Sequence, residues 1–221
     1  MDSRCLIKVC GMMHGDNIRA VEQLGADFIG LVFCPCSPRF VRATPDYLPI
    51  RARRVGVFRN QPADAIRRQA GCLGLDYVQL HGSESPAVCR SLQAAGLRVI
   101  KAFQVGGPAD IDRAAAYEGC CAYYLFDTPS VLGGGSGRQF DWNLLGCYAG
   151  RTPFLLSGGL DETCLDALRA LEHPLLAGVD VNSRFETSPG RKDIGRLQCF
   201  VQELRGWSGG SSRCPSISLT L

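Results

Sequence analysis

The sequence lacks the features that mark several large classes of protein. No apolar run is long enough to span a membrane, and Arg4 and Lys8 interrupt the first apolar run, which argues against a signal peptide. No long basic run occurs, and the net charge is only +3, so a nucleic-acid partner is not expected. We therefore predict a cytoplasmic protein that binds neither nucleic acid nor a membrane.

The 12 cysteines lack the spacing of a zinc knuckle. Cys34-Pro35-Cys36 and Cys120-Cys121 are close pairs, but no paired C-x-x-C motif occurs and the three histidines are scattered. A chain of this length without a secretory signal is also an improbable disulfide scaffold. We interpret the cysteines as reduced, mostly small core residues, and we predict no metal site.

Apolar runs and helical patterns alternate along the chain. The composition, with 46% hydrophobic and 20% charged residues, suits one globular domain with a full core. Most of the apolar runs do not alternate with polar residues, which is typical of parallel strands buried on both faces. Eight such runs occur: Leu6–Val9, Phe28–Phe33, Val55–Phe58, Tyr77–Leu80, Val99–Phe103, Tyr123–Phe126, Phe154–Leu156 and Val179–Val181.

Helical patterns separate these runs. They cover Asp16–Leu24, Ala63–Leu73, Ala87–Ala95, Pro108–Tyr117, Asp161–Leu171 and Asp193–Leu204, with less regular crossovers at Pro45–Arg53 and Phe140–Tyr148. Eight strands with about eight helices predict an α/β fold, a closed (β/α)8 TIM barrel over residues 1–205. An open doubly wound sheet is the alternative, but no Gly-x-Gly-x-x-Gly follows the first strand. Residues 206–221 are linker-like, and we predict that they form a disordered tail.

The carboxyl ends of barrel strands carry the candidate catalytic residues, because active sites of this fold form there. Cys10 follows the first strand, and its thiolate is a possible base or nucleophile. Asp127 ends the sixth strand, where partial desolvation suits a general acid. Arg39, after the second strand, can pair with a carboxylate, and His81, after the fourth, can line the pocket. Each of these residues also has a plainer interpretation. Cys10 can be a core thiol and Asp127 can cap a turn, while Arg39 can be a solvated arginine and His81 can cap the barrel.

Lys101, near the end of the fifth strand, is either an inward-facing polar residue or a lysine satisfied within the barrel wall. The loops after strands seven and eight are the usual phosphate site of this fold. Gly158 and Gly159 expose backbone N–H groups there, and a helix that begins at Asp161 adds its dipole. The glycine-rich segment Gly133–Gly137 can close over a ligand or act as a plain connector.

Taken in order, these motifs resemble the phosphoribosylanthranilate isomerase family of tryptophan biosynthesis. The matching segments are Lys8-Val9-Cys10-Gly11, Gly25–Gly30, Ser37-Pro38-Arg39, Val55–Phe58, Val78–Gly82, Leu125-Phe126-Asp127, Gly134–Gly137 with Phe140-Asp141-Trp142, Leu156–Leu160 and Gly178–Ser183. The resemblance extends from residue 8 to about residue 193. Any one motif is common, but the ordered set is highly specific.

The resemblance implies an isomerase that carries out an Amadori rearrangement of a phosphosugar by acid–base catalysis, without cofactor or metal. It assigns the base role to Cys10 and the acid role to Asp127. It places Arg39 on the anthranilate carboxylate of the substrate. The expected phosphate contacts are Gly158, Gly159, Ser183 and Arg184, and His81 and Asp180 are expected to line the same pocket. Family members occur as monomers and homodimers.

The chain departs from the family pattern at Asn182 and Arg184, where many relatives carry a small residue and a glycine. Two neighbouring phosphosugar barrels are alternatives. An aldose–ketose isomerase of the histidine pathway has an aspartate base where Cys10 stands, and an indole-glycerol-phosphate synthase needs a lysine that Phe28–Phe33 does not contain. A third alternative is a non-catalytic barrel that binds a phosphorylated ligand as a sensor.

Overall fold

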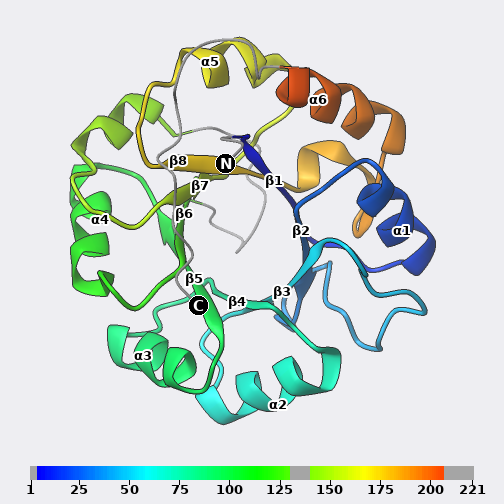
Figure 1. Cartoon of the computed structure of the whole chain (residues 1–221), viewed down its shortest axis with the longest axis horizontal. Coiled ribbons are helices and arrows are strands. Elements are labelled where there is room, and N and C mark those ends of the chain that lie inside the picture. Colours follow the sequence, from blue (N-terminus) through cyan, green and yellow to red (C-terminus); the bar gives the residue numbers. More distant parts are fainter. Residues whose placement is uncertain (1–3, 130–139, 207–221) are drawn as a thin grey trace.

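The chain forms a closed barrel of eight parallel strands in the order β1 to β8 (Figure 1). The computed structural model describes residues 4–129 and 140–206. The strands are β1 (Leu6–Val9), β2 (Phe28–Val32), β3 (Arg53–Phe58), β4 (Tyr77–Leu80), β5 (Arg98–Gln104), β6 (Tyr123–Asp127), β7 (Phe154–Leu156) and β8 (Leu176–Val181). Each predicted strand is therefore present, and the predicted barrel is confirmed.

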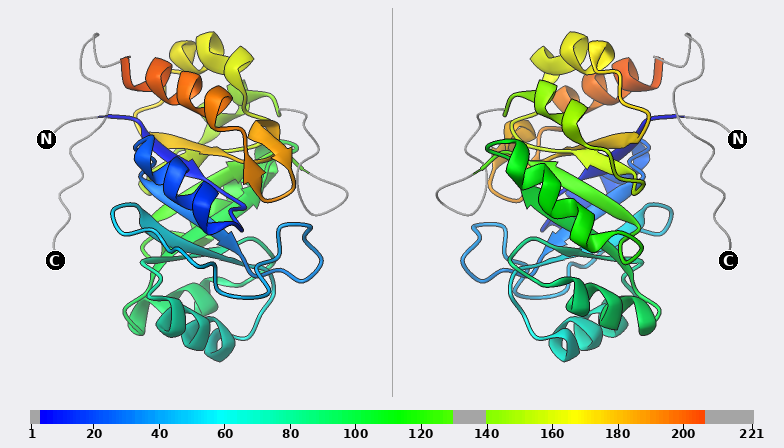
Figure 2. Two further views of the ribbon diagram at one scale, coloured as in Figure 1. Left: turned by 90° about the vertical axis from the view of Figure 1, so that its right-hand side faces the viewer. Right: turned by 90° about the vertical axis from the view of Figure 1, so that its left-hand side faces the viewer.

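Helices and 3-10 turns surround the barrel, except between β2 and β3, which a segment without a helix connects (Figure 1). They are α1 (Gly15–Gln23), α2 (Ala63–Leu73), α3 (Pro86–Ala94), α4 (Pro108–Asp112), α5 (Leu165–Ala170) and α6 (Ile194–Gly206), with the 3-10 turns η1 (Arg113–Tyr117), η2 (Trp142–Cys147), η3 (Glu162–Cys164) and η4 (Ser183–Phe185). A two-stranded hairpin, β9 (Glu186–Ser188) and β10 (Arg191–Lys192), follows β8. In the side views, this hairpin and the β2–β3 crossover extend from the same end of the barrel (Figure 2).

Several predicted helices differ from the observed ones. The pattern at 108–117 divides into α4 and η1, and the pattern at 161–171 begins with η3 before α5. The crossover predicted at 140–148 is the 3-10 turn η2. The helical crossover predicted at 45–53 is wrong, because that segment is irregular until β3 begins. Of the tail predicted at 206–221, Gly206 ends α6 and the rest lies outside the described residues, as does Gly133–Gly137.

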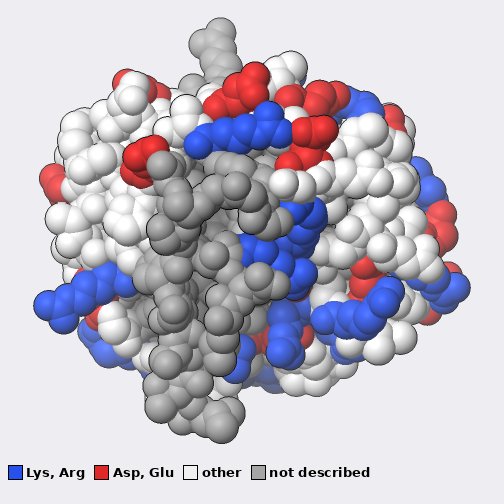
Figure 3. All heavy atoms as spheres, turned by 45° about the horizontal axis from the view of Figure 1, so that its top comes forward, with Lys and Arg blue, Asp and Glu red and all other residues white. Residues whose placement is uncertain are grey.

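Apolar side chains fill both the inside of the barrel and the space between barrel and helices. Inside, Phe28 packs edge-to-face against Tyr77 and Tyr123, with ring centroids 5.3 and 6.0 Å apart. Ion pairs lie near the ends at which strands begin; Asp27 binds Arg4 and Arg205 there, each at 2.7 Å. Figure 3 shows Lys and Arg side chains gathered near the middle of one face. Because side chains fill the interior of the barrel, we look for a binding site at the end where the strands finish, opposite the ion pairs of Asp27.

The Glu22 carboxylate holds the crossover that lacks a helix. Its Oε1 accepts the backbone N–H groups of Ile50, Arg51 and Ala52 at 2.8, 2.6 and 2.8 Å, and its other oxygen accepts the Tyr47 hydroxyl. Burial alone raises the pKa of Glu22, but these hydrogen bonds outweigh it and lower the pKa below its ordinary value. The buried Glu22 carboxylate therefore accepts backbone N–H groups that, in a helix, would donate to carbonyl groups of the same helix.

Replacing Glu22 with alanine is expected to lower the free energy of unfolding by about 3 kcal/mol, because three backbone donors lose a charged acceptor. The folded-state pKa is lowered, so this stabilisation is present above the unfolded-state pKa and is lost as pH falls through the folded-state value. Urea unfolding at neutral and acidic pH measures both effects. Glu203→Gln, at an exposed position on α6, is the control; equal stability of Glu22→Ala and this control would contradict the prediction.

Candidate active site

All nine side chains or glycines that the sequence predicts for the site line one pocket at the carboxyl ends of the strands. They are Cys10, Arg39, His81, Asp127, Gly158, Gly159, Asp180, Ser183 and Arg184. The strand ends bring them together from six strands across 174 residues of sequence. The structure thus places each predicted residue at one site, while their chemical roles rest on the geometry described below.

Cys10 extends the pairing of β1 with β8, since its backbone N–H donates to Val181 O at 2.9 Å. Side chains two residues apart point to the same face of a strand, so Cys10 and Lys8 both point into the barrel. On the neighbouring strand β2, Gly30 leaves space for the thiol, because a Cβ atom at Gly30 would lie 2.7 Å from Cys10 Sγ. The thiol is therefore fixed at the floor of the pocket.

Lys8 is a fully buried cation beside this thiol. Its Nζ lies 2.8 Å from Asp180 Oδ1, at the β8 position that pairs with it in register. Burial opposes the charge of Lys8, but Asp180 and the hydrogen-bonded Cys10 raise its pKa above the ordinary value. The Asp180 carboxylate therefore favours the charged form of Lys8 beside Cys10.

Burial raises the pKa of the Cys10 thiol, while Lys8 and, less strongly, Lys192 oppose this increase. Cys34 lines the same pocket but binds only the carbonyl of Val57, at 3.7 Å, and burial raises its pKa to about 11. Of these two cysteines, Cys10 is the one whose thiolate is favoured by two ammonium groups, those of Lys8 and Lys192. Since cations stabilise a thiolate, Cys10 is the better candidate base.

Asp127 and His81 are joined across the pocket. Gln79 Nε2 lies 2.9 Å from His81 Nδ1, and His81 Nε2 lies 3.3 Å from Asp127 Oδ2. An amide N–H can only donate, so Nδ1 is the acceptor in this contact and Nε2 is the ring nitrogen that faces the carboxyl group. Asp127 Oδ1 accepts the backbone N–H of Thr128 at 3.0 Å. These contacts orient Asp127 into the pocket.

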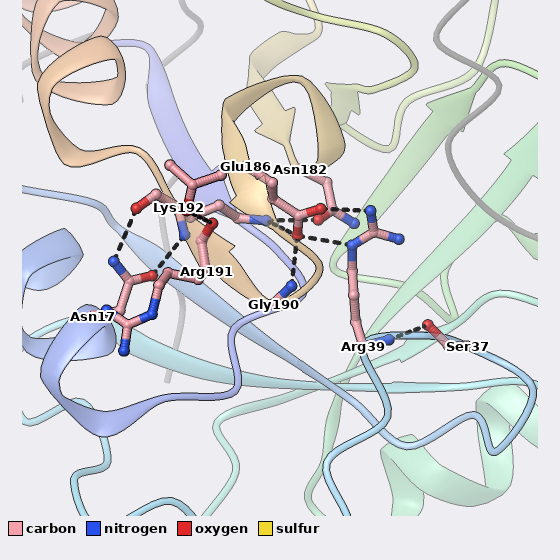
Figure 4. A network of polar contacts seen from close by, with 9 residues as sticks. Asn17, Ser37, Arg39, Asn182, Glu186, Gly190, Arg191 and Lys192 are labelled. Carbon is pink, nitrogen blue, oxygen red and sulfur yellow. Dashed lines mark hydrogen bonds and ion pairs between the residues drawn. The ribbon is translucent and has the colours of Figure 1, made fainter.

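Arg39 is held by the β9–β10 hairpin (Figure 4). Its Nε and Nη2 donate to the two oxygens of Glu186 at 2.8 and 2.6 Å, and Lys192 Nζ donates to Glu186 Oε1 at 2.8 Å. Lys192 also donates to Asn182 Oδ1 at 2.7 Å. Two cations share one carboxylate, so the cluster keeps one net positive charge with which to bind an anion.

Glycines after β7 and a 3-10 turn after β8 form the other side of the pocket. Gly158 has φ +97°, and a Cβ atom there would lie 2.6 Å from the backbone nitrogen of Thr128, so the loop requires glycine. Ser183 begins η4. Arg184 Nε lies 4.0 Å from Asp161 Oδ2, the carboxylate that caps η3. Backbone N–H groups and one guanidinium thus lie where a phosphate can bind.

Sequence reasoning missed several residues that shape the site. Lys8 was recognised only as part of a motif, although a lysine inside an apolar strand is itself a signal of a buried ion pair. Glu186 and Lys192 follow β8 in a segment to which no element was assigned, so nothing in the sequence placed them beside Arg39. Lys101 is the satisfied wall lysine: its Nζ donates to Gly82 O and contacts Glu84 Oε2, at 2.7 and 3.1 Å.

A closed parallel barrel that gathers a thiol, a carboxyl group and cations in one pocket at the carboxyl ends of its strands is the arrangement of a (β/α)8 enzyme. Comparisons with known proteins give the family. The family model of N-(5'-phosphoribosyl)anthranilate (PRA) isomerase matches residues 7–203. The curated N-(5'-phosphoribosyl)anthranilate isomerase of Phocaeicola vulgatus is 48% identical over 200 residues, which are 90% of this chain and 98% of the relative.

Solved structures agree with this match. A phosphoribosylanthranilate isomerase in complex with reduced 1-(o-carboxyphenylamino)-1-deoxyribulose 5-phosphate is 32% identical, with a TM-score of 0.78 over 91% of this chain and 99% of that chain. Monomers generated from the dimeric enzyme of Thermotoga maritima are 31% identical, with the same TM-score and the same coverage. The chain belongs to the phosphoribosylanthranilate isomerase family.

The described residues include no helix with the length and apolar character needed to cross a membrane.

Proposed function

We propose that the chain catalyses the Amadori rearrangement of N-(5-phospho-β-D-ribosyl)anthranilate to 1-(2-carboxyphenylamino)-1-deoxy-D-ribulose 5-phosphate in tryptophan biosynthesis. One observation carries the proposal: Cys10 on β1 and Asp127 on β6 line the same pocket as a net cationic cluster and a glycine loop. A base, an acid and two anion-binding regions are what this substrate, with one carboxylate and one phosphate, requires.

In the proposed reaction, Asp127 donates its proton to the ribose ring oxygen. The C1–O bond breaks, the anthranilate nitrogen supplies the electron pair, and a protonated Schiff base forms. The Cys10 thiolate then removes the proton from C2, and the electrons move into the C1–C2 bond to give an enolamine. Ketonisation releases the C2 hydroxyl proton and adds a proton at C1. Atoms balance, so the reaction is an isomerisation that uses only acid–base groups.

Arg39 is proposed to bind the anthranilate carboxylate, and Arg184 and the backbone near Gly158, Gly159 and Ser183 the phosphate. Glu186 holds the Arg39 guanidinium through Nε and Nη2, so neither of these two bonds uses Nη1, the nitrogen proposed to meet the carboxylate. The excess positive charge of the Arg39–Lys192–Glu186 cluster supports this role. At the other end of the pocket, the Arg184 guanidinium adds a positive charge beside the glycine loop.

The proposed activity is tested by following the fluorescence of N-(5-phosphoribosyl)anthranilate, generated in situ, with purified protein. A saturable loss of fluorescence that depends on the protein supports the isomerase. Binding of the substrate without any loss of fluorescence would instead favour the sensor alternative. A histidine-pathway phosphosugar, offered separately, tests the neighbouring barrel activity.

Lys8→Gln is expected to lower kcat/KM about tenfold at neutral pH, because loss of the cation raises the pKa of Cys10 further and one pKa unit corresponds to a tenfold change in thiolate. The pH at which kcat/KM reaches its plateau therefore shifts upward. Lys192→Gln, a more distant charge change, serves as the comparison and is expected to shift the profile less. An unchanged profile in Lys8→Gln would remove Lys8 from the ionisation of Cys10.

Arg39→Ala is expected to raise KM about 10- to 100-fold with a smaller effect on kcat, through loss of a charge-assisted contact to the substrate carboxylate. Glu186 keeps its bond to Lys192, so the hairpin retains a paired carboxylate. Arg42→Ala, an exposed arginine of the same crossover, is the matched control. A lower kcat at unchanged KM would place the Arg39 contact in the transition state alone.

The cytoplasmic location and the choice between monomer and homodimer stay predictions. The dimeric relative from Thermotoga maritima makes a homodimer the first state to test. Sedimentation equilibrium of the full chain distinguishes the two states.

A further inference from the structure

Three thiols converge in the helical layer, apart from the pocket described above. Cys89 lies on α3, and Cys120 and Cys121 lie in the turn that leads from η1 into β6. Their Sγ atoms all lie within 4.8 Å of one another. None of the three lines the candidate active site. The sequence predicts no metal site because it has no paired C-x-x-C motif; Cys89 is 31 positions before Cys120, and only folding places α3 against η1.

The cluster is shielded on one side and open on the other. Cys89 and Cys120 are 0% and 1% exposed. Cys121 is half-buried and lines a separate hollow together with Glu118 and Cys147. An ion can therefore enter past Cys121, while Cys89 and Cys120 exclude water from the inner side. This combination of buried ligands with one accessible edge provides the entry path that a metal site requires.

The three thiols lie close enough together to share one ion, since their Sγ atoms are all within 4.8 Å of one another. Cys120 Sγ donates to Tyr117 O at 2.9 Å, which fixes its rotamer. Cys120 is thus held in place beside the other two thiols.

We propose that Cys89, Cys120 and Cys121 bind a Zn²⁺ ion as three thiolates, with a water from the hollow as fourth ligand. Zinc accepts tetrahedral sulfur ligands at about 2.3 Å, which sets the sulfur atoms about 3.8 Å apart. That spacing lies within the observed limit of 4.8 Å. Each thiol releases its proton to solvent as it binds. The site would tie α3 to the start of β6.

The charge around the cluster favours a divalent ion over a monovalent one. Three thiolates carry three negative charges, and the Lys101 ammonium is already paired with Glu84 at 3.1 Å. A divalent ion leaves one uncompensated negative charge, and a monovalent ion leaves two. Soft thiolate ligands, without any carboxylate among them, also select against magnesium and calcium.

The test uses the full chain, reduced and stripped of metal. Cd²⁺ serves as the spectroscopic probe, because its thiolate charge-transfer absorption grows with the number of sulfur ligands, and Zn²⁺ affinity is measured by competition with a chelator. We expect one tight equivalent. Cys89→Ser and Cys121→Ser are each expected to weaken it by about 100-fold, the upper end of the loss caused by removing a supporting group of a metal site. Cys72→Ser, at an exposed position on α2, is the matched control.

A second measurement needs no variant. In the wild-type chain, Zn²⁺ is expected to protect Cys89, Cys120 and Cys121 from alkylation, read by peptide mass spectrometry, while Cys72 and Cys199 stay reactive. A tight equivalent that persists in Cys89→Ser, or absence of protection at all three cysteines, overturns the proposal. A disulfide between two of the three, found after exposure to air but with no zinc-dependent protection, also overturns it.

Discussion

Cys10→Ala is expected to lower kcat by about 10²–10⁴-fold, the contribution of a positioned general base. The thiolate removes the C2 proton in the proposed reaction, and alanine offers no acceptor in its place. The substitution removes a small side chain at the pocket floor, so the barrel and the anion-binding regions should stay intact and KM should change little. The measurement is steady-state loss of substrate fluorescence at saturating substrate.

Cys34→Ala is the matched control, since Cys34 is a second buried thiol on the same pocket whose Sγ donates to the carbonyl of Val57. It is expected to keep most of the activity. The pH profile adds a further check: burial raises the pKa of Cys10, so wild-type kcat/KM should rise with pH as the thiolate forms, and this rise should be absent from the residual activity of Cys10→Ala. Equal activity of Cys10→Ala and wild type would move the base elsewhere.

Asp127→Asn is expected to lower kcat by about 10²–10⁴-fold, because the amide is nearly the same shape but has no acidic proton for the ring oxygen. The side-chain oxygen can still accept the backbone N–H of Thr128, so the pocket geometry is retained. Binding of the reduced product analogue should therefore be kept while turnover is lost. Titration of the analogue alongside the kinetic assay separates these two effects.

Asp141→Asn is the control for Asp127→Asn, since Asp141 is exposed and caps η2 without lining the pocket. Its expected kcat is close to that of the wild type. Should Asp127→Asn lose analogue binding and activity together, Asp127 would be a binding group and another acid would have to open the ring.

The barrel and the ends of its strands could be predicted from the sequence alone, because parallel strands that are buried on both faces appear as continuous apolar runs. The chemistry-bearing residues stand directly after those runs, at Cys10, His81 and Asp127. The crossover at 45–53 was wrong for a physical reason. A tertiary contact holds this segment: the Glu22 carboxylate accepts its backbone N–H groups, so the segment does not need the internal hydrogen bonds of a helix.

The local order of apolar runs, glycines and polar strand ends determined the barrel, the family and the residues around the pocket. Only the tertiary structure decided what surrounds each of those residues: Lys8 and Asp180 beside Cys10, Glu186 and Lys192 on Arg39, and the convergence of Cys89 with Cys120 and Cys121. Strand periodicity is a local property that neighbouring residues encode. Charge pairing and thiol clustering join residues far apart in the chain, and their distances exist only once the barrel has closed.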